Sequence, residues 1–174
     1  MSERPTAEAL RHVPLLSGLA EPELVEVAGL AELKTLEAQL PLFREGEAGD
    51  ALVLLLSGSA QVVKRDPGGR HQILSVLSAP AVLGEMAVLE AGGKRSASAL
   101  AVGPVTFATV SGPSLRALLA SGNVAALRIA QGLAKLLARR LGEVNTRLVQ
   151  VLQSGKADAG VAEARDALGH DTSS

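Results

Sequence analysis

The sequence predicts an α+β protein that is mainly β, in which an antiparallel sandwich or barrel is flanked by N-terminal helices and a long C-terminal helix. Between about residues 35 and 111, apolar runs of four to eight residues alternate with Gly, Pro, Asp and Ser clusters every 8–12 positions. This punctuation is typical of short antiparallel strands. Helical periodicity precedes the region and returns after it, which indicates helices at both ends.

Composition excludes several classes of protein. The chain has 174 residues and a net charge of −1; 47% of it is hydrophobic, but only 1% is aromatic. There is therefore no aromatic platform for stacking bases and no basic footprint for DNA or RNA. The absence of cysteine excludes disulfides, Cys-ligated zinc and a thiol nucleophile. No apolar run reaches membrane-spanning length and the N-terminus carries acids, so we expect a cytoplasmic protein.

The N-terminal segment, residues 1–34, is expected to be helical. Its first part has one apolar face, formed by Ala9, Leu10, Val13 and Leu16. Pro22, with Glu21 and Glu23 beside it, then opens a second helix, because proline and acids are favoured in the first turn. The β region follows over residues 35–111, and the sequence Asp-Pro-Gly-Gly at 66–69 predicts a tight hairpin turn.

The C-terminal segment, residues 112–152, is expected to contain a short helix after Pro113 and a long one from about residue 124. Two sets of apolar residues repeat every seven positions: Leu127, Ala134, Leu141 and Leu148, and, offset by three, Ala130, Leu137, Val144 and Val151. This pattern favours a homodimer through the long helix, 124–152; the alternative is an amphipathic helix lying on its own barrel. Residues 153–174 are small and polar, and we expect a disordered tail.

Three stretches carry a more specific pattern. Residues 44–65 place Gly46 and Gly49-Asp50 before an apolar strand. Residues 83–102 have a Gly-Glu pair, a short apolar segment and, ten positions after the glutamate, Arg-Ser-Ala. Residues 137–152 are the C-terminal part of the expected long helix. In this order they resemble the cyclic nucleotide-binding domain family from about residue 10 to 150, and the third stretch is similar to the long helix of bacterial catabolite-activator-type regulators.

The resemblance implies a jelly roll with a phosphate-binding cassette at residues 83–98. Glu85 is the candidate acceptor for the ribose 2′-hydroxyl, because a carboxylate only accepts hydrogen bonds. Arg95 is the candidate for the phosphate, since its planar fork of donors stays charged in a buried pocket. Gly84 would allow close backbone approach to the sugar.

The other cassette residues have supporting roles. Met86 and Ala87 belong to a helical turn whose free amides are expected to point at the phosphate. Ser96 offers a hydroxyl and an amide, and Ala97 leaves room. Taken alone, a glutamate and an arginine in a hairpin are more often a solvated pair.

Further residues are assigned to turns, solvent and pocket walls. Gly46, Gly49 and Asp50 are expected to serve turns rather than ligand contacts. Glu90 is expected to be a solvent charge. The pocket walls would come from strand residues that can equally be ordinary core: Val62, Leu74, Leu83 and Val102.

The sequence departs from the family at both ends of the pocket. Pro80 lies where the family has a Gly-Asp turn, and Gln39 replaces a glycine at the start of the jelly roll. The resemblance places Val144 and Asn145 at the positions that meet adenine. Val144 cannot hydrogen-bond a base, whereas Asn145 or the next residue, Thr146, can. Cyclic AMP is the expected ligand, with cyclic GMP left open.

The expected function is a stand-alone cyclic nucleotide sensor without a helix-turn-helix, signalling through its C-terminal helix to an unidentified effector protein, with no DNA and no membrane partner. The alternative is a degenerate domain that mediates protein–protein contact without nucleotide. An enzyme is disfavoured because His12, His71 and His170 are scattered and form no His-x-His spacing. We expect no catalytic residue, metal or cofactor.

Overall fold

A computed structural model describes residues 3–89 and 92–168. The chain divides into two compact units, the first ending at Leu133 and the second beginning at Ala134. The first unit holds the N-terminal helices, both β-sheets and the start of the C-terminal helix. No single helix in the described part of the chain is long and apolar enough to cross a membrane; two helices reach that length only when counted together across a sharp bend.

The N-terminal segment contains α1 (Ala7–Arg11), the 3-10 turn η1 (Pro14–Leu16) and α2 (Glu21–Leu30). The predicted apolar face is confirmed at Leu10, Val13 and Leu16, which are at most 1% exposed. The predicted start of α2 is also confirmed, because the Glu23 carboxylate accepts a hydrogen bond from the Ala20 amide at 2.7 Å.

The boundary of this segment differs from the expectation. Helix α2 ends at Leu30, and strand β1 begins at Ala31 rather than after residue 34. The physical reason is cross-strand pairing, since β1 pairs with β8 in unbroken register from Ala31–Val110 to Leu36–Val105. The local sequence signal at this junction is weak, because a single glycine, Gly29, precedes it and no proline lies beside it.

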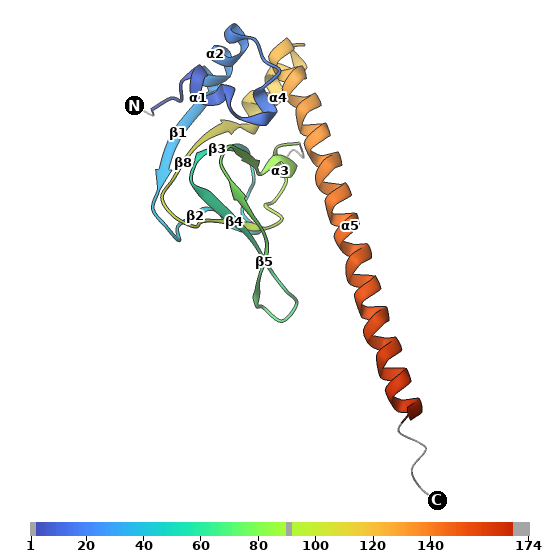
Figure 1. Cartoon of the computed structure of the whole chain (residues 1–174). Coiled ribbons are helices and arrows are strands. Elements are labelled where there is room, and N and C mark those ends of the chain that lie inside the picture. The colour runs from blue at the N-terminus through green and yellow to red at the C-terminus, as the bar shows by residue number, and fades with distance from the viewer. Residues whose placement is uncertain (1–2, 90–91, 169–174) are drawn as a thin grey trace, which may run out of the picture. The chain divides into compact units, whose positions relative to one another are not determined.

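Eight strands form two four-stranded antiparallel sheets, in the orders β1-β8-β3-β6 and β2-β7-β4-β5 (Figure 1). The strands are β1 (Ala31–Leu36), β2 (Pro41–Phe43), β3 (Ala51–Ser57), β4 (Ser59–Arg65), β5 (His71–Ser78), β6 (Ala81–Leu83), β7 (Ser98–Ala101) and β8 (Val105–Ser111). Strands distant in sequence lie side by side in both sheets. This arrangement confirms the predicted antiparallel jelly roll.

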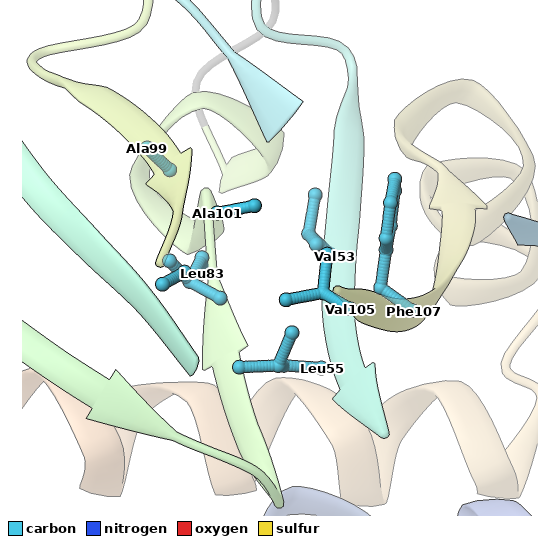
Figure 2. Packing of buried hydrophobic residues seen from close by; sticks show 8 residues of the cluster. Val53, Leu55, Leu83, Ala99, Ala101, Val105 and Phe107 are labelled. Atoms are coloured by element: carbon cyan, nitrogen blue, oxygen red, sulfur yellow. The ribbon is translucent and has the colours of Figure 1, made fainter. Parts of the chain in front are cut away.

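The core lies between the two sheets, as Figure 2 shows, and it is almost entirely aliphatic. Its buried cluster comprises Val53, Leu55, Ala60, Leu83, Ala99, Ala101, Val105 and Phe107. Small alanines on β4 and β7 face larger side chains from the opposite sheet. With few aromatic side chains available, this alternation of small and large residues fills the interior.

The hairpin between β4 and β5 confirms the turn predicted at 66–69. The Asp66 carboxylate accepts a hydrogen bond from the Arg70 amide at 2.9 Å, and Gly69 has a φ of +81°. Hydrogen bonds from the turn lower the pKa of Asp66, with the Arg70 amide as the largest cause. The turn chemistry therefore fixes where β5 begins its return.

After β8, α4 (Gly112–Ala120) and α5 (Val124–Leu168) complete the chain. The Asn123 side chain caps α5 by accepting a hydrogen bond from the Ala126 amide at 3.0 Å. Residues 153–168, where we expected a disordered tail, continue α5 in the structure. Alanine has the highest helix propensity, and alanines recur through this stretch. Residues 169–174 lie outside the described chain.

Candidate functional site

The cassette begins where β6 ends. Gly84 follows Leu83 with a φ of +74°, and α3 (Glu85–Leu89) starts at the next residue. A Cβ on Gly84 would lie 2.0 Å from Arg95 Nη1 and 3.2 Å from the Ala51 carbonyl oxygen. Both the backbone conformation and the lack of space therefore require glycine here.

Arg95 is the centre of the site and is only 7% exposed. Its Nη1 donates to the Gly84 carbonyl at 3.2 Å, and its Nη2 donates to the Ala51 carbonyl at 2.8 Å. The guanidinium carbon lies 4.3 Å from the centroid of the Phe43 ring. Within the described residues, Nε is buried without a hydrogen-bond partner. The arginine is thus held in place with a buried donor left over.

The electrostatics of Arg95 reflect its burial. Desolvation lowers its pKa, and the carboxylates of Glu47, Glu85 and Asp50 oppose that shift by favouring the charged form. Glu85 is itself only 6% exposed. The two residues predicted to bind opposite ends of a ligand are therefore both buried, and they interact electrostatically.

The remaining cassette residues lie around this pair. Ser96 is exposed, and its hydroxyl lies 3.9 Å from the sulfur of Met86. Met86 is 51% exposed and Ala97 is 8% exposed. Ala87 is part of α3. The Gly-Glu pair, the helical turn and the Arg-Ser-Ala sequence therefore lie close together in space. Glu90, which we expected to be a solvent charge, lies outside the described residues.

Backbone hydrogen bonds join the cassette to the loop between β2 and β3. The Gly46 amide donates to the Arg95 carbonyl and the Arg95 amide donates to the Glu47 carbonyl, both at 2.9 Å. The Gly49 amide likewise donates to the Gly93 carbonyl at 2.9 Å. Gly46 has a φ of +82°, as its predicted place in a turn requires. The loop therefore holds the backbone on both sides of Arg95.

Asp50 has a role beyond the predicted turn. Its carboxylate pairs with Arg116 Nη2 at 3.0 Å, and its carbonyl accepts from the Gly112 amide at 2.8 Å. Arg116 Nη1 donates to the carbonyl of Val88 in α3 at 2.9 Å. Arg116 of α4 therefore connects the cassette helix to the residue that precedes Ala51. Sequence reasoning missed this contact because its partners are 28 and 66 positions away.

The four residues expected to form the pocket walls differ in burial. Leu83 is 2% exposed and belongs to the core cluster, and Val62 is half-buried and packs against it. Leu74 and Val102 are 49% and 51% exposed. Leu83 and Val62 therefore belong to the apolar core or pack against it, which was the alternative expectation for all four. Leu74 and Val102 lie largely on the surface.

The two base-contact candidates lie on α5 in the second unit. Val144 is 58% exposed, and Asn145 is exposed as well. The hydroxyl of the next residue, Thr146, donates to the Gly142 carbonyl at 3.0 Å. The Asn145 side chain has no hydrogen-bond partner among the residues that the structure describes. Their role in the site remains a prediction.

Phe43 and Ala51 are the site residues that sequence reasoning missed. Phe43 contributes the face of its ring and Ala51 only its backbone carbonyl, so no sequence motif identifies either residue. Together with Gly84 they hold a buried arginine beside a buried glutamate. Such a site suits a ligand that carries an anion and, within a few ångströms, a hydroxyl donor.

The jelly roll thus carries a buried arginine and a buried glutamate in one short segment. A sequence model of the family described as "Cyclic nucleotide-binding domain" matches residues 33–122. The chain belongs to this family.

Similar proteins share this description. The chain is 37% identical over 140 residues to the cyclic AMP receptor protein of Thermus thermophilus, covering 78% of this chain and 60% of that protein. It is 30% identical over 111 residues to a CRP-like cAMP-activated global transcriptional regulator of Mycobacterium tuberculosis, covering 64% of this chain and 47% of that one. The chain thus spans about half to three fifths of the length of these relatives.

Among solved structures, a cyclic nucleotide-binding domain from Methylobacillus flagellatus superposes with a TM-score of 0.76 at 25% identity. The match covers 86% of this chain and 87% of that domain. The likeness therefore includes nearly the whole of both chains.

Proposed function

We propose that this protein is a cyclic nucleotide sensor in which Arg95 binds the cyclic phosphate and Glu85 accepts the ribose 2′-hydroxyl. The observation that carries the proposal is the buried guanidinium of Arg95, held by two carbonyls and the Phe43 ring but with Nε unpaired in the described structure. An anion beside it would offset the desolvation of the cation and satisfy the remaining donor. Gly84 keeps the backbone close enough for this contact.

Cyclic AMP is the proposed ligand. The relatives in Thermus thermophilus and Mycobacterium tuberculosis are named for cyclic AMP, which supports the assignment. At the end of the ligand that carries the base, Asn145 is the proposed contact to adenine. Val144 can contribute no hydrogen bond to the base. We therefore expect weaker discrimination between cyclic AMP and cyclic GMP than two polar residues would give.

The proposed output passes through α5 to a protein partner, with a homodimer formed along residues 124–152. Support comes from the heptad positions Leu141, Val144, Leu148 and Val151, which are 54–67% exposed within the single chain. Four large apolar side chains on one seam are costly to leave in water, and a second copy of the helix would cover them. Ligand binding would then shift the population between two dockings of this helix.

Isothermal titration calorimetry with cyclic AMP and cyclic GMP tests the proposal. Arg95→Ala should weaken binding on the order of a hundredfold, because a desolvated phosphate would lose its charged partner. Glu85→Gln keeps the shape but not the charge and should cost about tenfold. Lys94→Ala is the matched control: it removes an exposed cation next to Arg95 and should leave affinity unchanged.

Two results would contradict the proposal. No heat from either nucleotide at about millimolar ligand would favour the protein–protein module instead. Equal losses in Lys94→Ala and Arg95→Ala would show that binding depends on general charge rather than on the cassette.

A further inference from the structure

A pocket lies on the face of the β2-β7-β4-β5 sheet that points away from the core. Its volume is about 480 Å³, and its lining residues are Arg44, Glu45, Val63, Arg65, His71, Ser98 and Leu100. None of these belongs to the proposed nucleotide site. The pocket is large enough for a small organic ligand.

Strand register shows that the pocket and the core occupy opposite faces of this sheet. Ala60 of β4 lies opposite Ala101 of β7, and both are at most 1% exposed in the core. The pair of Val63 and Ser98 lies three positions along the same ladder, so it points to the outer face because side chains alternate along a strand. The pocket therefore lies on the outer side of β7, the strand that follows Arg95, and its lining includes no cassette residue that we assign to the nucleotide site.

The floor of the pocket is apolar and covered. Val63 is only 5% exposed although it lies on the outer face, and Leu100 beside it is half-buried. The long polar side chains of the loop between β2 and β3, and those of the β4–β5 hairpin, line the same pocket and shield Val63 from water. The pocket thus combines an apolar floor with a polar rim.

The rim carries two guanidinium groups. Arg65 Nε donates to His71 Nε2 at 3.2 Å, so that nitrogen of the imidazole accepts and the proton lies on Nδ1. The Arg44 side chain makes no hydrogen bond or ion pair within the residues that the structure describes. The rim also carries one carboxylate, that of Glu45, so its two guanidinium groups outnumber its acidic groups.

The other polar groups of the rim are already oriented. Ser98 Oγ accepts from the Glu45 amide at 2.9 Å, which leaves its hydroxyl proton to donate. The Glu45 carboxylate accepts from the Arg65 amide at 3.1 Å and is held against the backbone there. The donors that remain for a ligand are the two guanidinium groups, the hydroxyl of Ser98 and Nδ1 of His71.

We propose that this outer pocket binds a phosphate monoester with a small apolar body. The phosphate dianion matches the two arginine forks in charge and geometry, and the apolar body covers Val63 and Leu100. A neutral ligand would leave the Arg44 guanidinium without an anion, and a bare anion would make no apolar contact with Val63 or Leu100. The proposal is independent of nucleotide binding, since it uses no cassette residue.

The test is a titration with phenyl phosphate followed by amide chemical shifts in a ¹H–¹⁵N spectrum. Shifts are expected at Glu45, Val63 and Ser98. Arg44→Ala and Arg65→Ala should each weaken binding about fivefold or more, because each removes one fork of donors. Both side chains are exposed, so the variants should fold.

Lys64→Ala is the matched control, because Lys64 lies between Val63 and Arg65 on β4 and points to the opposite face. It removes the same charge and should leave affinity unchanged. Two further probes separate the ligand chemistry: benzoate, which replaces phosphate by carboxylate, should bind more weakly, and neutral benzyl alcohol should not bind.

The phosphate could instead enter the cassette, so the titration is repeated with Arg95→Ala. Unchanged shifts at Glu45 and Ser98 in that variant support the outer pocket whether or not the protein binds a cyclic nucleotide. Shifts confined to Gly84 and Ser96 that disappear in Arg95→Ala would overturn the proposal. So would wild-type affinity in Arg44→Ala and Arg65→Ala.

Discussion

The guanidinium of Arg95 stacks on the ring of Phe43, 4.3 Å from its centroid, so one of the chain's two phenylalanines covers the face of a buried cation. The ring occupies the face of the guanidinium and leaves its edge to hydrogen bonding. Two of the edge nitrogens are bonded to carbonyls, of Gly84 and Ala51. The geometry therefore directs any additional acceptor toward the remaining edge.

Phe43→Leu should weaken cyclic nucleotide binding several-fold, because it removes a cation–π contact of about 1–2 kcal/mol in a desolvated site. Calorimetry measures the affinity, and chemical denaturation measures the free energy of unfolding. Phe107→Leu is the control, since Phe107 packs in the core cluster. It should lower stability and leave affinity intact. Equal losses of affinity in the two variants would contradict a specific role for the Phe43 ring.

Gly84→Ala should abolish nucleotide binding and destabilise the fold by about 1–3 kcal/mol, through strain at positive φ and collision with the Arg95 guanidinium. Gly92→Ala separates the two causes. Gly92 has the same φ of +74°, but a Cβ there would meet nothing within 4 Å. It should show the strain alone, with binding retained. Nucleotide binding by Gly84→Ala at wild-type affinity would show that Arg95 is free to move aside.

Arg116→Ala should loosen α3, because the Val88 carbonyl and the Asp50 carboxylate both lose their donor. We expect a loss of about 1–2 kcal/mol in the free energy of unfolding and faster hydrogen exchange at the α3 amides. Asp50→Asn keeps an acceptor oxygen for Arg116 and should show a smaller effect. Unchanged exchange in α3 would mean that Arg116 does not hold the cassette.

Leu141→Asp should convert a dimer into a monomer, because it places a charge in the apolar seam of α5. Size-exclusion chromatography with light scattering measures the mass. Gln150→Asp is the control, as it adds the same charge to α5 away from the seam and should leave the dimer intact. A Leu141→Asp protein that remains dimeric would locate the interface elsewhere.

Gln39→Gly should stabilise the protein by about 0.5–1 kcal/mol. Gln39 has a φ of +66°, a left-handed conformation that costs residues with a Cβ about 1 kcal/mol. Its amide donates to the Ala101 carbonyl at 2.8 Å, so the conformation is fixed by the sheet. Gln39→Ala keeps the strain and should bring no gain. A midpoint of thermal unfolding that does not rise in Gln39→Gly would contradict this account.

Local sequence signals predicted those parts of the fold that local chemistry determines. The hairpin at 66–69 and the cassette around Gly84 both depend on glycines and acids whose effects act within a few residues. The start of β1 at Ala31 was missed because only pairing with β8 defines it. The continuation of α5 to Leu168 was not predicted, because residues 153–168 are small and polar and lack a regular apolar pattern.

The candidate site likewise contains residues with a local sequence signal and residues without one. Glu85 and Arg95 could be predicted because their residue types and spacing carry the chemistry. Phe43 could not, since a lone phenylalanine before a loop is indistinguishable from core until the tertiary fold brings it to the arginine. The Ala51 carbonyl carries no side-chain signal at all, and the contact crosses 44 positions.

The positions of the two phenylalanines make the protein its own spectroscopic probe. Phe43 lies against the buried arginine and Phe107 lies in the core cluster. Uniform incorporation of fluorophenylalanine would therefore give a ¹⁹F spectrum with two resonances, one sensitive to occupation of the cassette and the other to integrity of the interior. A change of the first without the second would report ligand binding in a folded protein, in a single measurement and without any engineered label.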